Sequence, residues 1–336
     1  MPDMKEVYEM VTQQTPPKPD ALERQHREQR RLSTKRQVGA YALVAGLVAL
    51  AVVVAANVLP QSDETAPGRV DPTRLSIVDP ETGRTTPVTG APVDAIGLDV
   101  SPNGSTIAFS SKKGVGQIFT MGIDGSYLRQ LTDDPHQAIA PDWSPNGDRI
   151  AYTAFGDTAS RGIYVMDADG SNQTLVVNDP DADELFGEWS PDGTSIVFVR
   201  EGDPKPGIYV VELSTGARTR LTREFGDGDP TWADDGASIV FARLGEAVPI
   251  ADIWIMRADG SGERELVARD AWDLAPEWAN GSVVFQSGIQ PLAFDDAVTL
   301  YDVFVFDGSS TRLVIADVNG ATWMPSGQLL VAHPAS

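Results

Sequence analysis

The chain has 336 residues, of which 41% are hydrophobic and 22% are charged, so it can bury a sizeable core and is not wholly disordered. Its formal net charge of -22 argues against a nucleic acid as the main partner, because phosphate binding requires a basic surface. The absence of cysteine excludes disulfides, thiolate metal sites and cysteine nucleophiles.

The first segment, residues 1–37, is mildly basic, with eight Lys/Arg and six Asp/Glu, and is predicted to be a cytoplasmic tail. Its apolar residues at 4–11 recur with the spacing of one helix face, namely Met4, Val7, Tyr8 and Val11. Two interpretations stay open: the tail is a solvated flank of a membrane anchor, or the stripe at 4–11 binds a cytoplasmic protein.

The second segment, residues 38–59, is apolar and carries no charge. As a helix rising ~1.5 Å per residue, it covers the ~30 Å of a bilayer core. A cleaved signal peptide is the competing interpretation, but the apolar region of a signal is usually shorter and follows fewer residues. We therefore predict an uncleaved, single-pass transmembrane helix. Basic residues precede it, whereas Asp63 and Glu64 follow it, so the remainder of the chain is expected outside the cytoplasm.

A polar linker is predicted at 60–71, and the acidic body at 72–334 is built of repeats. Six turn glycines recur at intervals of 43, 46, 43, 45 and 46 residues, at Gly104, Gly147, Gly193, Gly236, Gly281 and Gly327. An apolar residue, tryptophan in five of the six units, stands just before each turn. A β-rich run follows each turn, and this pattern is typical of a β-hairpin.

A second hairpin recurs between these, so each unit of about 40–45 residues has four strands, which is typical of a β-propeller blade. The body starts with the second kind of hairpin, at 75–88, and ends with the first kind, at 322–333. We expect the two ends to share one blade, because this removes two exposed sheet edges. The predicted fold is all-β: a six-bladed β-propeller preceded by one transmembrane helix and a short cytoplasmic tail.

The repeat sequence resembles a known family. Residues 141–154, PDWSPNGDRIAYTA, and 162–176, GIYVMDADGSNQTLV, are similar to the WD-like repeats of the TolB-like six-bladed propellers. The resemblance covers about residues 70–333 and implies the propeller fold, but propellers host many activities. TolB carries an α/β domain before its propeller, and the predicted membrane span replaces that domain here.

No catalytic motif stands out. The nucleophile elbow Gly-x-Ser-x-Gly and the phosphate-binding Gly-x-x-x-x-Gly-Lys are absent, and His26, His136 and His333 are isolated in the sequence. The repeated tryptophans are expected to pack between blades rather than to bind a ligand. The sequence therefore leans away from an enzyme.

The strongest site candidates are acids one residue before the repeated apolar position, on the innermost strands: Asp99, Asp142, Glu188 and Glu277. Four acids at one level repel each other unless a cation, an arginine or a backbone amide partners them, or their pKa values rise. Calcium is the metal that oxygen ligands favour, so a calcium ion in the channel is one interpretation. Trp272, expected in a loop beside Asp270 and Asp273, is the aromatic ligand-contact candidate.

The hairpin turns fall on one face of the predicted propeller and the longer connections on the other. These connections carry many acids: Asp133, Asp134, Asp157, Asp179, Asp181, Asp183, Glu184, Glu201, Asp203, Asp227, Asp229, Glu246, Asp295 and Asp296. The predicted function is an extracytoplasmic scaffold whose acidic face binds a protein or a cationic ligand. A transmembrane regulator that holds a cytoplasmic factor, and a metal-assisted hydrolase or lyase, are the alternatives.

Overall fold

The computed structural model describes residues 75–90, 95–111, 116–133, 137–155, 160–202, 205–224, 226–245, 250–269, 271–288, 301–318 and 320–333. All of them belong to one compact unit, Ala56–Ser336. The predicted tail, transmembrane helix and linker lie outside the described residues. Within the described residues, no helix is long and apolar enough to cross a membrane.

All regular structure in the described residues is β-strand, arranged in antiparallel sheets. One four-stranded sheet joins the two ends of this unit, and its strands are β1 (Leu75–Val78), β2 (Thr85–Val88), β23 (Gly320–Trp323) and β24 (Leu329–Ala332). The next comprises β3 (Ala95–Val100), β4 (Thr106–Ser111), β5 (Gln117–Gly122) and β6 (Arg129–Gln130).

Two further four-stranded sheets follow in chain order. The first comprises β7 (Ala138–Trp143), β8 (Arg149–Phe155), β9 (Arg161–Asp167) and β10 (Thr174–Val177). The second comprises β11 (Asp183–Trp189), β12 (Ser195–Glu201), β13 (Gly207–Glu212) and β14 (Arg218–Arg220). In each sheet the strands pair in sequence order, as successive hairpins require.

The last sheet has eight strands in two halves. One half comprises β15 (Asp227–Trp232), β16 (Ser238–Leu244), β17 (Ala251–Arg257) and β18 (Arg264–Val267). The other comprises β19 (Trp272–Ala279), β20 (Ser282–Gly288), β21 (Tyr301–Phe306) and β22 (Thr311–Val318). The halves meet at a single parallel pair, Ala251 with Trp272, and pairing within each half repeats the four-strand pattern.

The prediction that the two ends of the repeat share a sheet is confirmed. β1 pairs antiparallel with β24, in a register that runs from Leu75 opposite Ala332 to Val78 opposite Leu329. β1 also pairs with β2, so it is a central strand with both edges covered. The hairpin β23–β24 thus completes the sheet that the first hairpin begins.

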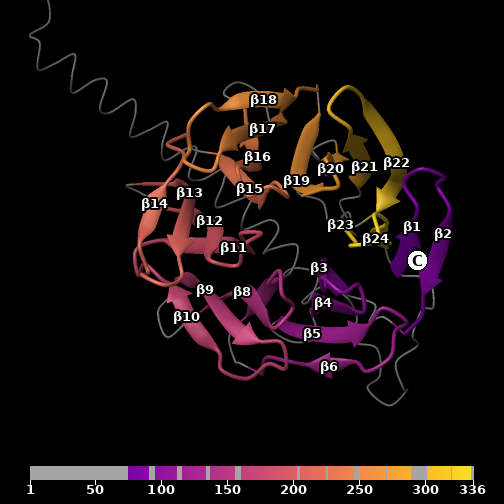
Figure 1. Ribbon diagram of the computed structural model, residues 1–336, viewed down its shortest axis with the longest axis horizontal. Coiled ribbons are helices and arrows are strands. Elements are labelled where there is room, and N and C mark those ends of the chain that lie inside the picture. Colours follow the sequence, from indigo (N-terminus) through magenta and orange to yellow (C-terminus); the bar gives the residue numbers. More distant parts are fainter. Residues whose placement is uncertain are drawn as a thin grey trace, which may run out of the picture. The chain divides into compact units, whose positions relative to one another are not determined.

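In each four-strand set one edge strand faces a common centre and the other edge strand lies at the periphery; in chain order the strand that faces the centre is the first of its set, except that it is β23 in the set that joins the two ends (Figure 1). We call the strands that face the centre, β3, β7, β11, β15, β19 and β23, the inner strands. Contacts run from each inner strand to the next and from β23 back to β3, so they form a closed circuit. Because neighbouring strands are antiparallel, the short hairpin turns share one end of the unit and the longer connections share the other, the long-connection end.

The core consists of aromatic pairs within sheets and apolar contacts between them. Phe109, Phe198 and Phe285 are fully buried on the second strand of their sets, and each stacks on an aromatic ring of the third strand. Trp143 packs with Ala108 of the preceding sheet. The expectation that the repeated tryptophans fill the space between sheets is therefore confirmed where the structure describes them.

Candidate functional site

The four predicted acids occupy equivalent places on four inner strands. Asp99 lies on β3, Asp142 on β7, Glu188 on β11 and Glu277 on β19. Each stands one residue before the repeated apolar position, and the side chains are half-buried. Threonine occupies this place on the other two inner strands. We call this set of four acids the inner acids.

Each inner acid forms a hydrogen bond with the next inner strand. Three of the carboxylates accept a backbone N–H, from Trp143 to Asp99 (2.6 Å), from Trp189 to Asp142 (2.7 Å) and from Trp323 to Glu277 (2.7 Å). The fourth, on Glu188, accepts the hydroxyl of Thr231 at 2.9 Å. The acids therefore link neighbouring sheets and hold the inner circuit together.

Burial and mutual repulsion make these carboxylates weaker acids. Burial raises the pKa of Asp99 to about 6 and the pKa of Glu277 to about 8. Burial also raises the pKa of Asp142 well above its usual range, and the charges of Asp99 and Glu188 raise it further. Part of the repulsion is thus relieved by protonation, because a neutral carboxyl still accepts the backbone N–H.

Backbone amides partner three of the inner acids and a threonine hydroxyl partners the fourth, and none is partnered by an arginine in the described residues. No ion pair among the described residues includes any of the four. Within those residues, no group of three or more His, Asp or Glu is arranged to hold a metal ion. The geometry therefore supports the amide interpretation of the inner acids and offers no support for a shared calcium ion.

A β-bulge precedes each inner acid and was not predicted. Three residues before the repeated apolar position the backbone adopts a positive φ, at Gly97, Ala140, Phe186, Asp229 and Ala275. The strand register shifts there, between Ile139 and Asp142 on β7 for example. Only glycine adopts this conformation freely, so the sequence signals it at one position alone.

The bulges form a second level of contacts between sheets. The N–H of Ala140 donates to the hydroxyl of Ser110 at 3.0 Å, and the N–H of Phe186 donates to the hydroxyl of Thr153 at 3.0 Å. The acceptor lies on the preceding sheet in both cases. This repeated arrangement fixes the inner strands relative to one another at the centre of the unit.

At the long-connection end, acids at the start of three consecutive inner strands pair with arginines. These pairs are Glu184 with Arg200 (3.9 Å), Asp227 with Arg243 (2.5 Å) and Asp273 with Arg269 (3.6 Å). The acid side chains are almost completely buried. A buried carboxylate requires such a partner, because leaving water costs an isolated charge several kcal/mol.

These contacts show that the acids predicted on the long-connection face are not all exposed. Glu184 and Asp227 are buried and paired rather than exposed, and Asp179 also binds Arg200, at 2.7 Å. Asp133 and Asp181 are exposed as expected. The remaining loop acids outside the described residues are Asp134, Asp157, Asp203, Glu246, Asp295 and Asp296.

Trp272 was predicted to lie in a loop, but it is the first residue of strand β19. It pairs with Ala251 of β17 and with Gly288 of β20, and its side chain is half-buried. The strand begins at Trp272 because β17 and β20 both offer backbone hydrogen-bonding groups to this segment, which would otherwise be unpaired. Trp272 therefore bridges two strand sets, and it lies on the same strand as the inner acid Glu277.

Closed circuits of four-stranded antiparallel sheets define the β-propeller class. Two overlapping stretches, residues 124–282 and 156–334, match the family model of the TolB beta propeller domain. The chain belongs to this family.

Curated relatives match over shorter stretches. The Tol-Pal system protein TolB of Anaeromyxobacter dehalogenans (strain 2CP-C) is 34% identical over 124 residues, which are 34% of this chain and 26% of the relative. The protein TolB homolog of Chlorobaculum tepidum is 32% identical over 109 residues, 32% of this chain and 24% of the relative. The chain thus aligns with about a quarter of the length of these two relatives.

Solved structures agree in fold. A TolB candidate from Agrobacterium tumefaciens superposes with a TM-score of 0.66 at 22% identity, covering 78% of this chain and 99% of that one. An oligogalacturonate lyase in complex with manganese gives a TM-score of 0.53 at 17% identity, covering 81% of each chain. At these identities the likeness supports the propeller architecture and says nothing of a shared reaction.

Proposed function

We propose that the chain is a six-bladed propeller that acts as a protein-binding scaffold through its long-connection end. The single observation that carries this proposal is the use of the inner acids as links between sheets. Because each accepts a hydrogen bond from the next inner strand, they build a rigid platform rather than a reactive centre. The name of the Anaeromyxobacter dehalogenans relative refers to the Tol-Pal system, which also favours a role in a protein assembly.

The long-connection end offers the variable surface of this platform. Loops held by a rigid scaffold are common binding sites, since they change without disturbing the sheets beneath. Asp133 and Glu224 are exposed there, on the connections that lead to β7 and β15. Exposed carboxylates attract a partner with a basic surface and guide its approach.

Exchanging the charge of these two acids is expected to weaken partner binding. The full chain would be used to capture and identify a protein, and the dissociation constant would then be measured for the variant Asp133→Lys with Glu224→Lys. We expect binding to weaken by about tenfold or more, because a basic partner now meets like charges. The matched control, Asp234→Lys with Glu265→Lys, changes two exposed acids elsewhere. Equal losses in both variants would contradict the proposal, as would the absence of any reproducible partner.

We also propose that residues 38–59 anchor this scaffold in a membrane, with residues 1–37 in the cytoplasm. The uncharged length of the segment and the basic residues before it support this topology. In an alternative form of this proposal, the chain is a transmembrane regulator, and residues 4–11 bind a cytoplasmic factor.

A tag placed after Ser336 is expected to be accessible to protease added outside intact cells. The membrane-bound product should retain residues 1–37, since the positive flank stays on the cytoplasmic side. An immunoblot with antibodies to each end measures both. A released body that begins near Asn57 would contradict the anchor and favour a cleaved signal.

A further inference from the structure

A cavity of about 370 Å³ lies at the long-connection end, beside the sheet β11–β14. Its wall comes from the connection between β10 and β11, the connection between β12 and β13, and strands β11 to β14. The volume lies in the range of sites that bind small molecules. None of the inner acids lines this cavity, so it is distinct from the set of inner acids described above.

One wall is anionic and contains an unused acceptor. Glu184 is completely buried, and its Oε2 accepts the backbone N–H of Asp179 at 3.0 Å. Its Oε1 is also buried but has no hydrogen-bond partner among the described residues, and Arg200 Nε is 3.9 Å away. Because a buried polar atom without a partner costs free energy, this atom is suited to accept a hydrogen bond from a ligand.

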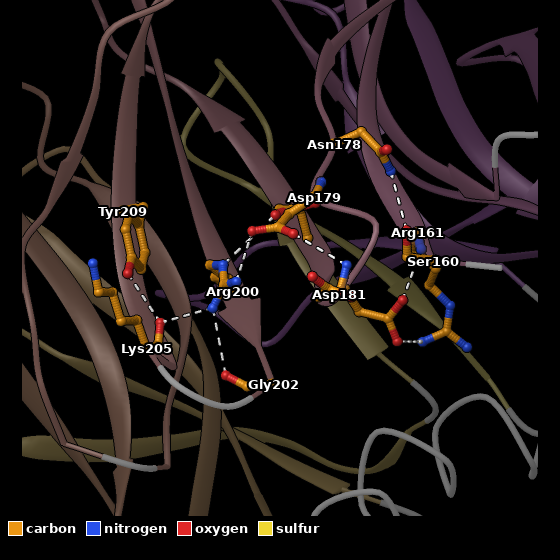
Figure 2. Close-up of polar contacts among 11 residues, drawn as sticks. Ser160, Arg161, Asn178, Asp179, Asp181, Arg200, Gly202, Lys205 and Tyr209 are labelled. Carbon is orange, nitrogen blue, oxygen red and sulfur yellow. Dashed lines mark hydrogen bonds and ion pairs between the residues drawn. The ribbon is translucent and has the colours of Figure 1, made fainter. Parts of the chain in front are cut away.

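The nearby arginine does not make that hydrogen bond, because its Nε lies 3.9 Å from Oε1 of Glu184, beyond hydrogen-bond distance. Figure 2 shows Arg200 reaching Asp179 with Nη2, at 2.7 Å, while Nη1 donates to the carbonyl oxygens of Gly202 and Lys205. Arg200 therefore fixes the two connections in place. Oε1 of Glu184 is thus left without a hydrogen bond among the described residues.

Two cationic side chains also line the cavity. Lys205 and Arg218 line the cavity and are exposed, and their side chains form no hydrogen bond or ion pair with the described residues. Phe198 and Tyr209 complete the wall as a stacked pair with ring centroids 5.8 Å apart. The hydroxyl of Tyr209 donates to the carbonyl of Lys205 at 2.9 Å, which holds this connection against the sheet.

We propose that this cavity binds a small zwitterion with an apolar side chain, such as a free amino acid. The ammonium group donates to Glu184, the carboxylate lies between Lys205 and Arg218, and the side chain meets the aromatic pair. A zwitterion also suits a chain with a net charge of -22, because a simple anion is repelled by the whole molecule whereas a neutral ligand is not. This small-molecule site goes beyond the proposed scaffold function.

Isothermal titration calorimetry of the full chain tests the proposal with L-leucine and L-phenylalanine. Two analogues of leucine separate the charges: 4-methylpentanoate keeps only the carboxylate, and 3-methylbutylamine keeps only the ammonium group. We expect at least one amino acid to bind with a dissociation constant below about 1 mM, and each leucine analogue to bind about tenfold or more weakly than leucine. No saturable binding of either amino acid overturns the proposal, and so does an analogue that binds as tightly as leucine.

The variants Arg218→Ala and Lys205→Ala locate the site. Both residues are exposed, so neither substitution should change the unfolding midpoint, but each should weaken amino-acid binding about tenfold. Arg264→Ala is the matched control, because Arg264 is an exposed arginine on β18, the outer strand of the next set. Unchanged binding by Arg218→Ala and Lys205→Ala would place the ligand elsewhere and refute the assignment. Because the exposed acids used to test the scaffold are not in this cavity, the two proposals can fail independently.

Discussion

Deletion of β1 and β2 is expected to destroy the cooperative fold of the described unit. β1 covers one edge of β24, and all four residues of β24 are buried. Without it, β23 and β24 are left as a two-stranded hairpin with an open edge, and such hairpins are marginal in water. Size-exclusion chromatography and thermal unfolding should show aggregation or a much lower unfolding midpoint.

Point substitutions in the same sheet test how much single residues contribute to this stability. Leu75 is 1% exposed, so Leu75→Ala should lower the free energy of unfolding by about 2–5 kcal/mol through the cavity it creates. Thr86→Ala, on the exposed face of β2, serves as the control and should change it by about 0.5 kcal/mol or less. A truncated chain that stays monomeric with an unchanged midpoint would contradict the role of this sheet.

Acidification from about pH 8 to about pH 6 is expected to stabilise the folded chain. The inner acids have raised pKa values when folded, so the folded state binds more protons than the unfolded state in this range. For Glu277 the window runs from the ordinary value of 4.5 to about 8, and for Asp99 from 3.8 to about 6. The free energy of unfolding therefore falls as pH rises through these windows, and urea unfolding at several pH values measures the slope.

The variant Glu277→Gln isolates this effect. Glutamine keeps an oxygen for the N–H of Trp323 but cannot ionise, so the variant should be more stable than the parent chain near pH 8. The advantage should disappear well below pH 4.5, where the glutamate is protonated in both states. Asp234→Asn, at an exposed position, is the control and should leave the slope unchanged. A parent chain whose stability rises between pH 6 and about pH 8 would contradict the raised pKa values.

The repeat made the β architecture predictable from sequence. The glycines such as Gly104 and Gly147 mark turns because they adopt a positive φ there, and the structure places them in that conformation. The tryptophans before these turns pack between sheets because a bulky apolar residue recurs where two sheets meet. The sequence also predicted that both ends share one sheet, because the repeat begins with the second kind of hairpin and ends with the first kind. This order can be read from the sequence alone.

The contacts around the candidate site were less predictable, since they depend on three-dimensional pairing. The sequence identified the inner acids but not their partners, because a backbone amide such as that of Trp189 has no residue type to signal it. The bulge at Phe186 requires a positive φ that local preference disfavours and tertiary contacts impose. The burial of Glu184 beside Arg200 depends on a residue sixteen positions later in the chain, at a spacing that no local motif describes.

The sheet that unites the first and last strands also has a consequence for the order of folding. Leu75 cannot meet Ala332 until nearly the whole chain has left the ribosome, so this sheet is the last that synthesis permits. The entropy of closing such a long loop rises only slowly with its length, but the search for a distant partner slows folding. During that interval the hairpin β1–β2 keeps an unpaired edge, which makes the newly made chain dependent on rapid completion or on protection by a chaperone.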